Sequence, residues 1–215
     1  RKSSRDAADE LCRHHQCQLM QSSATTMSGF LLERLDNEDW QRLREVQLRA
    51  MRDSPDVFFR SLAEEEALLE KEWRLRAERG VTLIAVPAHS PQAGGALEDV
   101  GIMSAAACPG QPGSATFGIW VAPAWRGRGL GSRLVDEAVS WAGSEGYRRM
   151  LLNVPDDNEA AIGLYKRKGF EPTGVSGVLP PPREHLRNHQ RALELGPPSA
   201  AGGEEPAAAG APPRA

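Results

Sequence analysis

The sequence predicts an α+β fold of three layers (α/β/α), in which a mixed, mainly antiparallel sheet of about seven strands is flanked by about four helices. Short apolar segments with strand-like composition alternate with segments whose apolar residues recur at helical spacing. Three strand-like segments follow one another in the middle of the chain, which indicates an antiparallel meander. The second half alternates in the order β-α-β-α-β. Residues 28–195, which carry these elements, have the length of a single domain.

Both ends of the 215-residue chain differ from this domain. Residues 1–27 show little hydrophobic periodicity, and residues 196–215 consist almost entirely of Gly, Ala and Pro. Neither composition can bury a core. We therefore expect a disordered N-terminal extension and a disordered C-terminal tail.

The cysteines are too few and too unevenly placed for a disulfide framework, which fits a reducing compartment. Cys108 stands alone, whereas Cys12, His14, His15 and Cys17 place four possible metal ligands in one short segment. Structural zinc sites combine ligands from two separated segments, and no matching pair lies nearby. We interpret the segment as a polar tail and expect no metal.

Charge and hydropathy argue against several classes of function. The 26 Lys and Arg residues and 29 Asp and Glu residues give a net charge of −3, so the chain has no basic field for phosphate backbones or acidic lipids. No stretch approaches the roughly 18 apolar residues that cross a bilayer, and the start lacks the apolar middle of a secretory signal. We expect a cytoplasmic protein that binds neither nucleic acid nor membrane. The sequence leaves open whether the chain forms a homodimer.

The first predicted elements are a strand and a helix. Residues 30–35 form a short apolar segment that predicts a strand. Asp36 then suits the N-cap of a helix, and Pro55 prevents its continuation. The apolar residues of this helix recur at helical spacing: Trp40, Leu43, Val46, Ala50 and Met51.

A second helix and the meander follow. Ser61 and Glu64 form a capping-box pattern, which predicts one helix that runs from there to Arg79 and stops at Gly80. The meander strands are expected at residues 81–86, 100–107 and 115–121.

The remaining elements alternate between helix and strand. Helices are expected at residues 129–144 and 158–168. Strands are expected at residues 150–154, as a short segment at Phe170, and at residues 185–195.

The most informative segment is a glycine-rich turn that joins a predicted strand to a predicted helix. Glycines let the backbone approach a ligand closely, and N–H groups at the start of a helix point at a negative group. Two arginines add positive charge. The turn therefore predicts an anion-binding loop. Its glycines and arginines are Arg126, Gly127, Arg128, Gly129 and Gly131.

Two other phosphate loops do not fit this turn. A P-loop needs Lys and then Ser or Thr after its last glycine, whereas Gly131 is followed by Ser132 and Arg133. A dinucleotide fingerprint needs glycine at Ser132 and an acidic residue about twenty positions later, where residues 151–153 are Leu-Leu-Asn.

The turn resembles instead the acyl-CoA loop of the GNAT superfamily of N-acyltransferases, whose pattern Gln/Arg-x-x-Gly-x-Gly/Ala is matched by Arg126, Gly129 and Gly131. Residues 119–123 look like the family's fourth strand. The likeness extends over residues 30–195. The family's second signature, Asn-x-x-Ala-x-x-Leu-Tyr followed shortly by Gly-Phe, is matched by Asn158, Ala161, Leu164, Tyr165, Gly169 and Phe170.

The resemblance implies a GNAT-like sheet and acetyl-CoA as co-substrate, without a metal. It places the pyrophosphate of acetyl-CoA on the N–H groups of residues 127–132 and the pantetheine arm beside the strand that ends at Val121. The residues implied to hold acetyl-CoA are Trp120, Val121, Arg126, Gly127, Arg128, Gly129, Leu130, Gly131, Ser132, Asn158, Ala161 and Tyr165.

The resemblance also implies two groups that act on the reacting atoms. The backbone N–H of Val121 would hydrogen-bond the thioester carbonyl and stabilise its developing oxyanion, and one such donor is worth about 3 kcal/mol. Tyr165 would donate a hydrogen bond or proton to the departing CoA thiolate. The spacing of Asn158, Ala161 and Tyr165 puts all three on one helical face, which supports a single site.

The general base is not evident from the sequence. Family members that carry a glutamate on the fourth strand differ from this chain, since residues 116–119 include no carboxylate. Each possible substitute fits a solvated surface better. A weakly basic amine needs a base least, because an α-amine with a pKa near 7.8 is over roughly 10% deprotonated at pH 7. The substitutes are Asp53, Glu64, Glu65, Glu66 and His185.

We therefore expect an N-acetyltransferase that moves an acetyl group from acetyl-CoA to a primary amine of a small molecule by direct attack. A protein or peptide amine acetyltransferase and a non-catalytic acyl-CoA sensor are the alternatives, and Tyr165 in its motif argues against the sensor. By resemblance, residues 53–66 and 175–185 shape the acceptor pocket. Core packing is the favoured interpretation of three aromatic residues that could line it: Phe58, Phe59 and Trp73.

Overall fold

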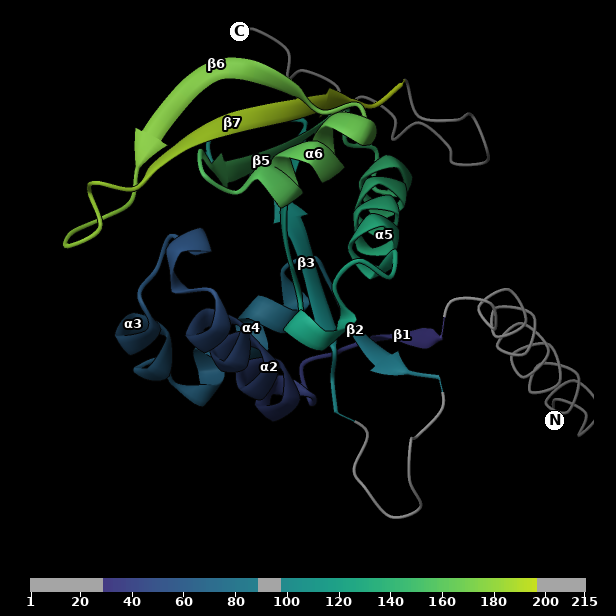
Figure 1. Ribbon diagram of the computed structural model, residues 1–215. Coiled ribbons are helices and arrows are strands. Elements are labelled where there is room, and N and C mark those ends of the chain that lie inside the picture. The colour runs from purple at the N-terminus through teal and green to yellow at the C-terminus, as the bar shows by residue number, and fades with distance from the viewer. Residues whose placement is uncertain (1–28, 89–97, 197–215) are drawn as a thin grey trace, which may run out of the picture.

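The computed structural model describes residues 29–88 and 98–196 and contains a seven-stranded sheet in the order β1-β2-β3-β4-β5-β7-β6 (Figure 1). Neighbouring strands are antiparallel except β4 and β5, which are parallel. This confirms the mixed, mainly antiparallel sheet. Its strands are β1 Phe30–Arg34, β2 Val81–Pro87, β3 Gly101–Ala107, β4 Ser114–Val121, β5 Arg149–Pro155, β6 Glu171–Val178 and β7 Arg187–Glu194.

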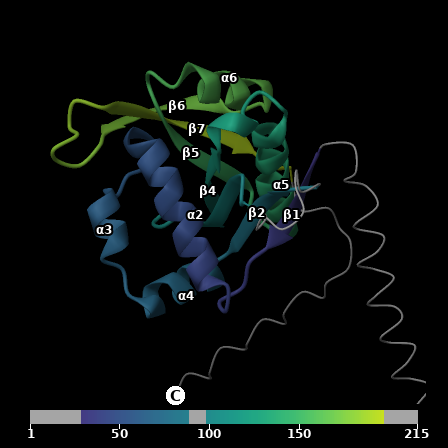
Figure 2. The ribbon, with the colours of Figure 1, turned by 60° about the horizontal axis from the view of Figure 1, so that its bottom comes forward.

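Helices cover both faces of the sheet, as the three-layer prediction requires (Figures 1 and 2). Helices α2 and α4 pack on one face, and α5 and α6 pack on the other. The α-helices of the described residues are α2 Trp40–Asp53, α3 Leu62–Glu66, α4 Glu70–Glu78, α5 Leu130–Ser144 and α6 Glu159–Arg167. The motif with Cys12, His14, His15 and Cys17 lies outside the described residues.

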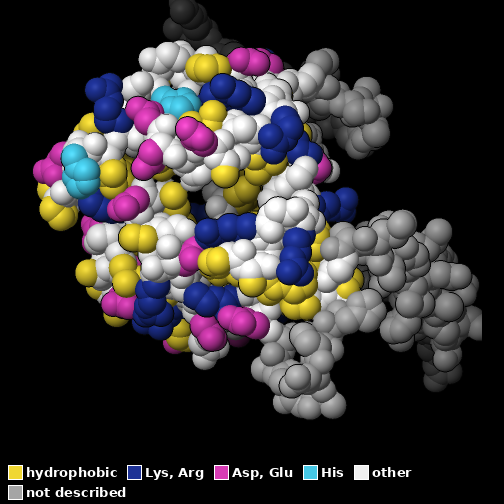
Figure 3. Space-filling model, viewed as in Figure 1, with side chains coloured by type: hydrophobic (Ala, Val, Ile, Leu, Met, Phe, Trp, Pro, Cys, Tyr) yellow, Lys and Arg dark blue, Asp and Glu magenta, His cyan; other side chains and the backbone are white. Residues whose placement is uncertain are grey.

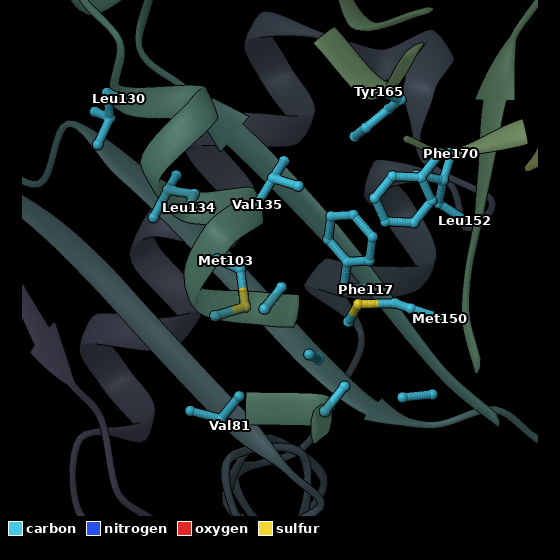
Figure 4. Close-up of a cluster of buried hydrophobic side chains, with 14 of the residues drawn as sticks. Val81, Met103, Phe117, Leu130, Leu134, Val135, Met150, Leu152, Tyr165 and Phe170 are labelled. Carbon is cyan, nitrogen blue, oxygen red and sulfur yellow. The ribbon is translucent and has the colours of Figure 1, made fainter. Parts of the chain in front are cut away.

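Alternation along β2 divides the hydrophobic core into two parts, because successive side chains of a strand point to opposite faces. Ile84 and Val86 pack with α2 and α4. Val81 and Ala85 pack in the core beneath α5, which also contains Phe117 of β4 (Figure 4). The pattern explains why β2 is apolar on both sides, as expected for a strand covered by helices on each face.

The prediction of one helix from Ser61 to Arg79 is wrong, because this segment forms two helices, α3 and α4. The capping box at Ser61 is present, with the Glu64 carboxylate accepting from the Ser61 N–H at 2.6 Å. Helix α3 then ends at Glu66, and α4 begins at Glu70. A second N-terminus forms there because the carboxylate of Glu72 accepts from the N–H of Leu69 at 2.8 Å.

The short strand predicted at Phe170 is displaced and longer in the structure. Phe170 is fully buried in the core, and the strand β6 starts at the next residue. Pro172 and Gly174 lie inside β6, although both residue types are depleted in strands. Pairing with β7 holds them there, with a shift of register between Pro172 and Ser176.

The contact between β4 and β5 is short. Only Ser114–Thr116 of β4 pair with Arg149–Leu151 of β5. The following parts of both strands, residues 117–121 and 152–155, lie beyond the paired register. The sheet therefore has an open gap between its two central strands.

Candidate active site

A cavity of about 630 Å³ lies at the gap between β4 and β5 (Figure 3). The glycine-rich loop and α6 line it from the face that carries α5. The segment after α2 and the end of β6 also line it. The cavity thus joins the side of α6 to the side of α2, so molecules that enter from the two sides can meet within it.

The backbone N–H of Val121 points into this gap. Val121 pairs with Gly101 of β3, and the next hydrogen bond runs from the N–H of Ala122 to the carbonyl of Val100 at 2.9 Å. In an antiparallel ladder this arrangement marks a non-hydrogen-bonded pair, whose N–H and C=O groups point away from the partner strand. The N–H of Val121 therefore faces the side of β5, where the two strands no longer pair.

The glycine-rich loop ends at the N-terminus of α5. Gly127 and Gly129 adopt positive φ angles of 75° and 84°, a region that favours glycine. Gly129 is the N-cap residue, and its carbonyl accepts from the N–H of Arg133 at 3.1 Å. The N–H groups between Gly129 and Arg133 have no partner within the helix and form a cradle suited to an anion. They belong to Leu130, Gly131 and Ser132.

The structure brings together most of the residues expected to hold acetyl-CoA. Those that line the cavity are Trp120, Val121, Arg126, Gly127, Gly131, Asn158, Ala161 and Tyr165. Gly129 and Ser132 are outside the lining, and the guanidinium of Arg128 lies over the ring of Trp125. The side chain of Leu130 is buried in the core (Figure 4), so only its backbone can contact a ligand in the loop.

Arg126 and Trp120 both turn toward Asp53 at the end of α2. The indole of Trp120 donates to the Asp53 carboxylate at 2.8 Å, and the guanidinium of Arg126 forms an ion pair with the same carboxylate. Arg126 also donates from Nε to the Val121 carbonyl at 2.9 Å. Its side chain therefore connects the strand end to α2. The Trp120 side chain packs in the core on the α2 face.

Asn158 lies one residue before α6, as its N-cap residue, and not within the helix as predicted. Its side-chain oxygen accepts from the N–H of Ala161 at 3.1 Å. Asn158 therefore orients the start of α6, and Ala161 and Tyr165 follow within the helix. All three still line the cavity.

Tyr165 lies where α6 meets the core. Its ring packs edge-on against Phe117 and Phe170, with ring centroids 5.9 Å away in each case (Figure 4). Burial raises the pKa of Tyr165 to about 12. The hydroxyl group therefore stays protonated at neutral pH and can only donate or accept a hydrogen bond there.

None of the carboxylates considered as a general base is well suited to the role. Burial opposes ionisation of Asp53, but hydrogen bonds from Trp120 and Ser54 and the charge of Arg126 outweigh it, so its pKa lies below the usual value. Hydrogen bonds from Ser61 likewise lower the pKa of Glu64. Low pKa values make both carboxylates weak bases.

The remaining candidates are engaged or distant from the cavity. Glu65 is buried and accepts two hydrogen bonds from Arg76, at 2.5 and 3.0 Å. Glu66 pairs with Arg52, at 2.6 Å. His185 is exposed and is not part of the cavity lining.

The aromatic residues considered for the acceptor pocket divide between core and cavity. Trp73 is fully buried in the core on the α2 face, as the favoured interpretation has it. Phe58 and Phe59 both line the cavity. Phe58 also packs against the core on the α2 face, whereas Phe59 is 68% exposed, so the core-packing interpretation is wrong for Phe59 alone. Asn153 and Asn188, which were not predicted from the sequence, also line the cavity. No local pattern marks them, because β5 and β7 come together only in the folded sheet.

Two further features of the described part of the chain concern metals and membranes. No group of three or more His, Cys, Asp or Glu side chains is placed there to hold a metal ion. None of the helices there has both the length and the apolar character required to cross a bilayer.

The family model, the sequence relatives and the solved structures that match this chain all include acetyltransferases. The family model described as "Acetyltransferase (GNAT) family" matches residues 40–170. The chain is 45% identical over 53 residues to an uncharacterized N-acetyltransferase of Methanocaldococcus jannaschii, which is 25% of this chain and 24% of that protein. The matches to three curated relatives each span less than a quarter of the relative's length.

Solved structures share the fold. The acetyltransferase of the GNAT family from Streptococcus pneumoniae aligns with a TM-score of 0.60 and 23% identity, over 78% of this chain and 99% of that one. A phosphinothricin acetyltransferase from Sinorhizobium meliloti, solved with acetyl-CoA, aligns with a TM-score of 0.60 and 19% identity, over 83% and 95% of the two chains.

Proposed function

Because the chain belongs to the GNAT acetyltransferase family, we propose that it transfers the acetyl group of acetyl-CoA to a primary amine of a small molecule. The observation that carries this proposal is the cavity at the β4–β5 gap, which joins an anion cradle to a separate space between α2 and β6. Its volume of about 630 Å³ lies within the range of small-molecule sites. The cytoplasmic location and the homodimer stay predictions from the sequence.

The residues at the N-terminus of α5 fit a pyrophosphate. The N–H groups of residues 130–132 point out of the helix end, and the helix dipole favours a negative group there. Gly131 lacks a side chain at the point where a Cβ would lie 3.4 Å from Leu164 and 3.8 Å from Val121. The pantetheine arm would then lie along the unpaired part of β4. Bound there, acetyl-CoA supplies an activated acetyl thioester.

In this proposal two groups of the chain assist acetyl transfer. The N–H of Val121, which faces the gap, donates to the thioester oxygen as negative charge develops on it. The hydroxyl of Tyr165 donates a hydrogen bond to the leaving sulfur. Full proton transfer from a group with a pKa of about 12 to a thiolate whose acid has a pKa near 8.5 is uphill by roughly 5 kcal/mol. Tyr165 therefore acts by hydrogen bonding.

The amine enters from the side of α2 and must arrive with its lone pair available. The carboxylates considered above are weak bases or are held in ion pairs. An amine that is partly deprotonated at neutral pH is thus the preferred acceptor. It attacks the thioester carbon directly, the C–S bond breaks, and the proton of the amine passes to solvent.

A thiol-release assay tests the proposal. Purified protein, acetyl-CoA and a panel of amines should release CoA thiol and yield the N-acetylated amine, detected by mass spectrometry. Binding of acetyl-CoA without thiol release for any amine, amino acid or peptide would support a sensor instead. Activity confined to peptides would support the protein or peptide acetyltransferase.

A further inference from the structure

One side chain joins the two segments that border the cavity away from α6. Arg183, in the loop between β6 and β7, donates to the carbonyl of Pro55 at 2.7 Å and to those of Phe58 and Phe59 at 3.0 Å each. These three acceptors belong to the segment between α2 and α3. In Figure 1 the β6–β7 loop reaches out on the same side of the molecule as α3.

The loop that carries Arg183 is itself internally bonded. The N–H of Leu179 donates to the Leu186 carbonyl at 3.0 Å, and the N–H of Arg183 donates to the Pro180 carbonyl at 2.9 Å. A planar guanidinium with several donors suits three carbonyls of one turn, whereas a lysine would present a single ammonium group. The loop is thus built to hold the segment after α2 in one position.

The cavity between these two segments, which we call the acceptor chamber, has apolar walls. Its walls are Val57, Phe58, Phe59, Val178 and Leu179. Three of them are also open to solvent, with exposed fractions of 68% for Phe59, 51% for Val178 and 37% for Val57. Exposed apolar residues gathered at the rim of a cavity mark a surface that a ligand covers.

The floor of the acceptor chamber is polar but uncharged. Thr116, Asn153 and Asn188 supply it, and none of the described residues that line the cavity is acidic. The nearby carboxylate of Asp53 is engaged by Trp120, Arg126 and Ser54. A second cationic group on an acceptor would lose water here without meeting a free carboxylate, which is unfavourable.

We propose that Arg183 holds the two segments together as one acceptor chamber, and that this chamber selects a small monoamine carried on an uncharged, apolar body of aromatic size. The inference rests on the proposed acetyl transfer and names the class of its acceptor. Arg183 is a positioning residue, because it contacts the chamber walls and not the reacting atoms.

Three amino-acid amides test the choice of acceptor. Phenylalaninamide, alaninamide and lysinamide all present an α-amine, so the lone pair is similarly available in all three. They differ in the side chain, which is aromatic, a methyl group or a second amine. We expect kcat/KM for phenylalaninamide to exceed that for alaninamide about 10- to 100-fold, the gain from burying an aromatic side chain. Lysinamide should be no better than alaninamide. Equal values for all three, or a preference for lysinamide, would overturn the proposal.

A short peptide with an N-terminal phenylalanine tests the size of the acceptor. If its kcat/KM exceeds that of phenylalaninamide more than about tenfold, the chamber serves a polypeptide and the small-molecule assignment is wrong. A value equal to or below that of the amide supports the proposal.

Variants of Arg183 test its positioning role. Arg183→Met should raise KM for phenylalaninamide about tenfold or more, with kcat at saturation, the Kd of acetyl-CoA and the KM for alaninamide unchanged. Arg183→Lys should recover part of the loss, because an ammonium can still reach one carbonyl. Arg187→Met, in the same hairpin and exposed, is the matched control. Equal losses for both amides, or no change, would contradict the role of Arg183.

Calorimetry separates this proposal from the acetyl transfer on which it rests. Phenylalaninamide is titrated into the protein saturated with CoA, where no turnover can occur. Tighter binding of phenylalaninamide than of alaninamide, lost in Arg183→Met, supports the chamber even if no thiol is ever released. If the protein acetylates amines but binds phenylalaninamide no more tightly than alaninamide, the proposed acceptor chamber is wrong and the acetyl transfer stands.

Discussion

The indole N–H of Trp120 donates a hydrogen bond of 2.8 Å to the carboxylate of Asp53, which joins the strand beside the gap to the last residue of α2. Trp120 is only 5% exposed, so its N–H depends on this acceptor. The same carboxylate holds the guanidinium of Arg126, which in turn binds the carbonyl of Val121. Asp53 thus fixes the strand end that borders the gap.

Two substitutions of Asp53 distinguish the contribution of its hydrogen bond to stability from the contribution of its charge. Asp53→Ala leaves the buried N–H of Trp120 without its acceptor, at a cost of about 1–3 kcal/mol in the free energy of unfolding. Asp53→Asn retains an oxygen that can accept and should lose less. Denaturant unfolding measures both, with Asp56→Ala as the exposed control. Equal stability of Asp53→Ala and wild type would show that the hydrogen bond adds nothing.

The advantage of wild type over Asp53→Asn should depend on pH in one direction. The pKa of Asp53 is lowered in the folded protein, so its ionised form contributes stability above the pKa of the unfolded chain. That contribution is lost as the pH falls through the lower, folded-state pKa. Unfolding curves from neutral to acid pH should therefore converge for the two proteins. A difference that grows toward low pH would contradict this assignment.

Gly131 offers a clean test of the proposed acetyl-CoA site, since its backbone is helical and needs no positive φ. A Cβ at this position makes ordinary contacts of 3.4 Å or longer, so Gly131→Ala should fold normally. Gly131→Val adds two methyl groups at the cavity wall. We expect it to abolish the rise in Tm that acetyl-CoA causes, which for 100 Kd of ligand corresponds to about 2.7 kcal/mol. An undiminished rise would refute the loop assignment.

Tyr165→Phe should leave acetyl-CoA binding intact and reduce kcat about 10- to 1000-fold, because the hydroxyl is needed chiefly as the thiolate departs. The ring contacts with Phe117 and Phe170 remain in this variant. Steady-state kinetics with the best amine, together with the Kd of acetyl-CoA, provides the measurement. Wild-type kcat in the variant would assign Tyr165 to packing alone.

The same tyrosine should make the protein sensitive to alkali. Its pKa is raised from the ordinary value of 10 to about 12 by burial. Above pH 10 the unfolded chain releases this proton while the folded chain retains it, so stability falls as the pH rises toward 12. The full loss in the free energy of unfolding is about 3 kcal/mol, which corresponds to the difference of about two units between the two pKa values. Unfolding experiments from pH 9 upward should show this extra loss in wild type and not in Tyr165→Phe.

Residues 28–195 alone should bind acetyl-CoA and unfold with nearly the same Tm as the full chain. The described core starts at Phe30 and includes elements up to Glu194, so the truncation keeps all of it. Thermal scans of both proteins, with and without acetyl-CoA, make the comparison. Stoichiometric zinc in the full chain, lost together with stability on truncation, would instead assign a structural metal to Cys12, His14, His15 and Cys17.

Local patterns predicted most of the fold, and contacts between distant residues account for what they missed. The capping box at Ser61 was visible because its partner lies three residues away. The break before α4 was not, because residues 67–69 are all good helix formers and only Glu72 marks the new start. Strand β6 contains Pro172 and Gly174, so its strand character comes from pairing with β7 and cannot be read from propensity.

The candidate site shows the same division. The two motifs marked the glycine-rich loop and α6, since each motif lies within one short segment. The side on which Trp120 packs depends on the face of the sheet that it occupies, and its partner Asp53 is 67 residues away. The carbonyls bound by Arg183 are 124 to 128 residues away. Such pairs follow from the assembled sheet and have no signature in the sequence.

The short pairing between β4 and β5 leaves the part of β4 after Thr116 without a partner strand on the side of β5. A ligand with amide groups, such as a pantetheine arm, can pair with this part of β4 as an extra strand. Binding then completes the sheet, and the backbone amides at the open edge should exchange with deuterium quickly in the free protein and slowly in the complex. Protection confined to Ile119 and Val121 would reveal the ligand as a structural part of the fold.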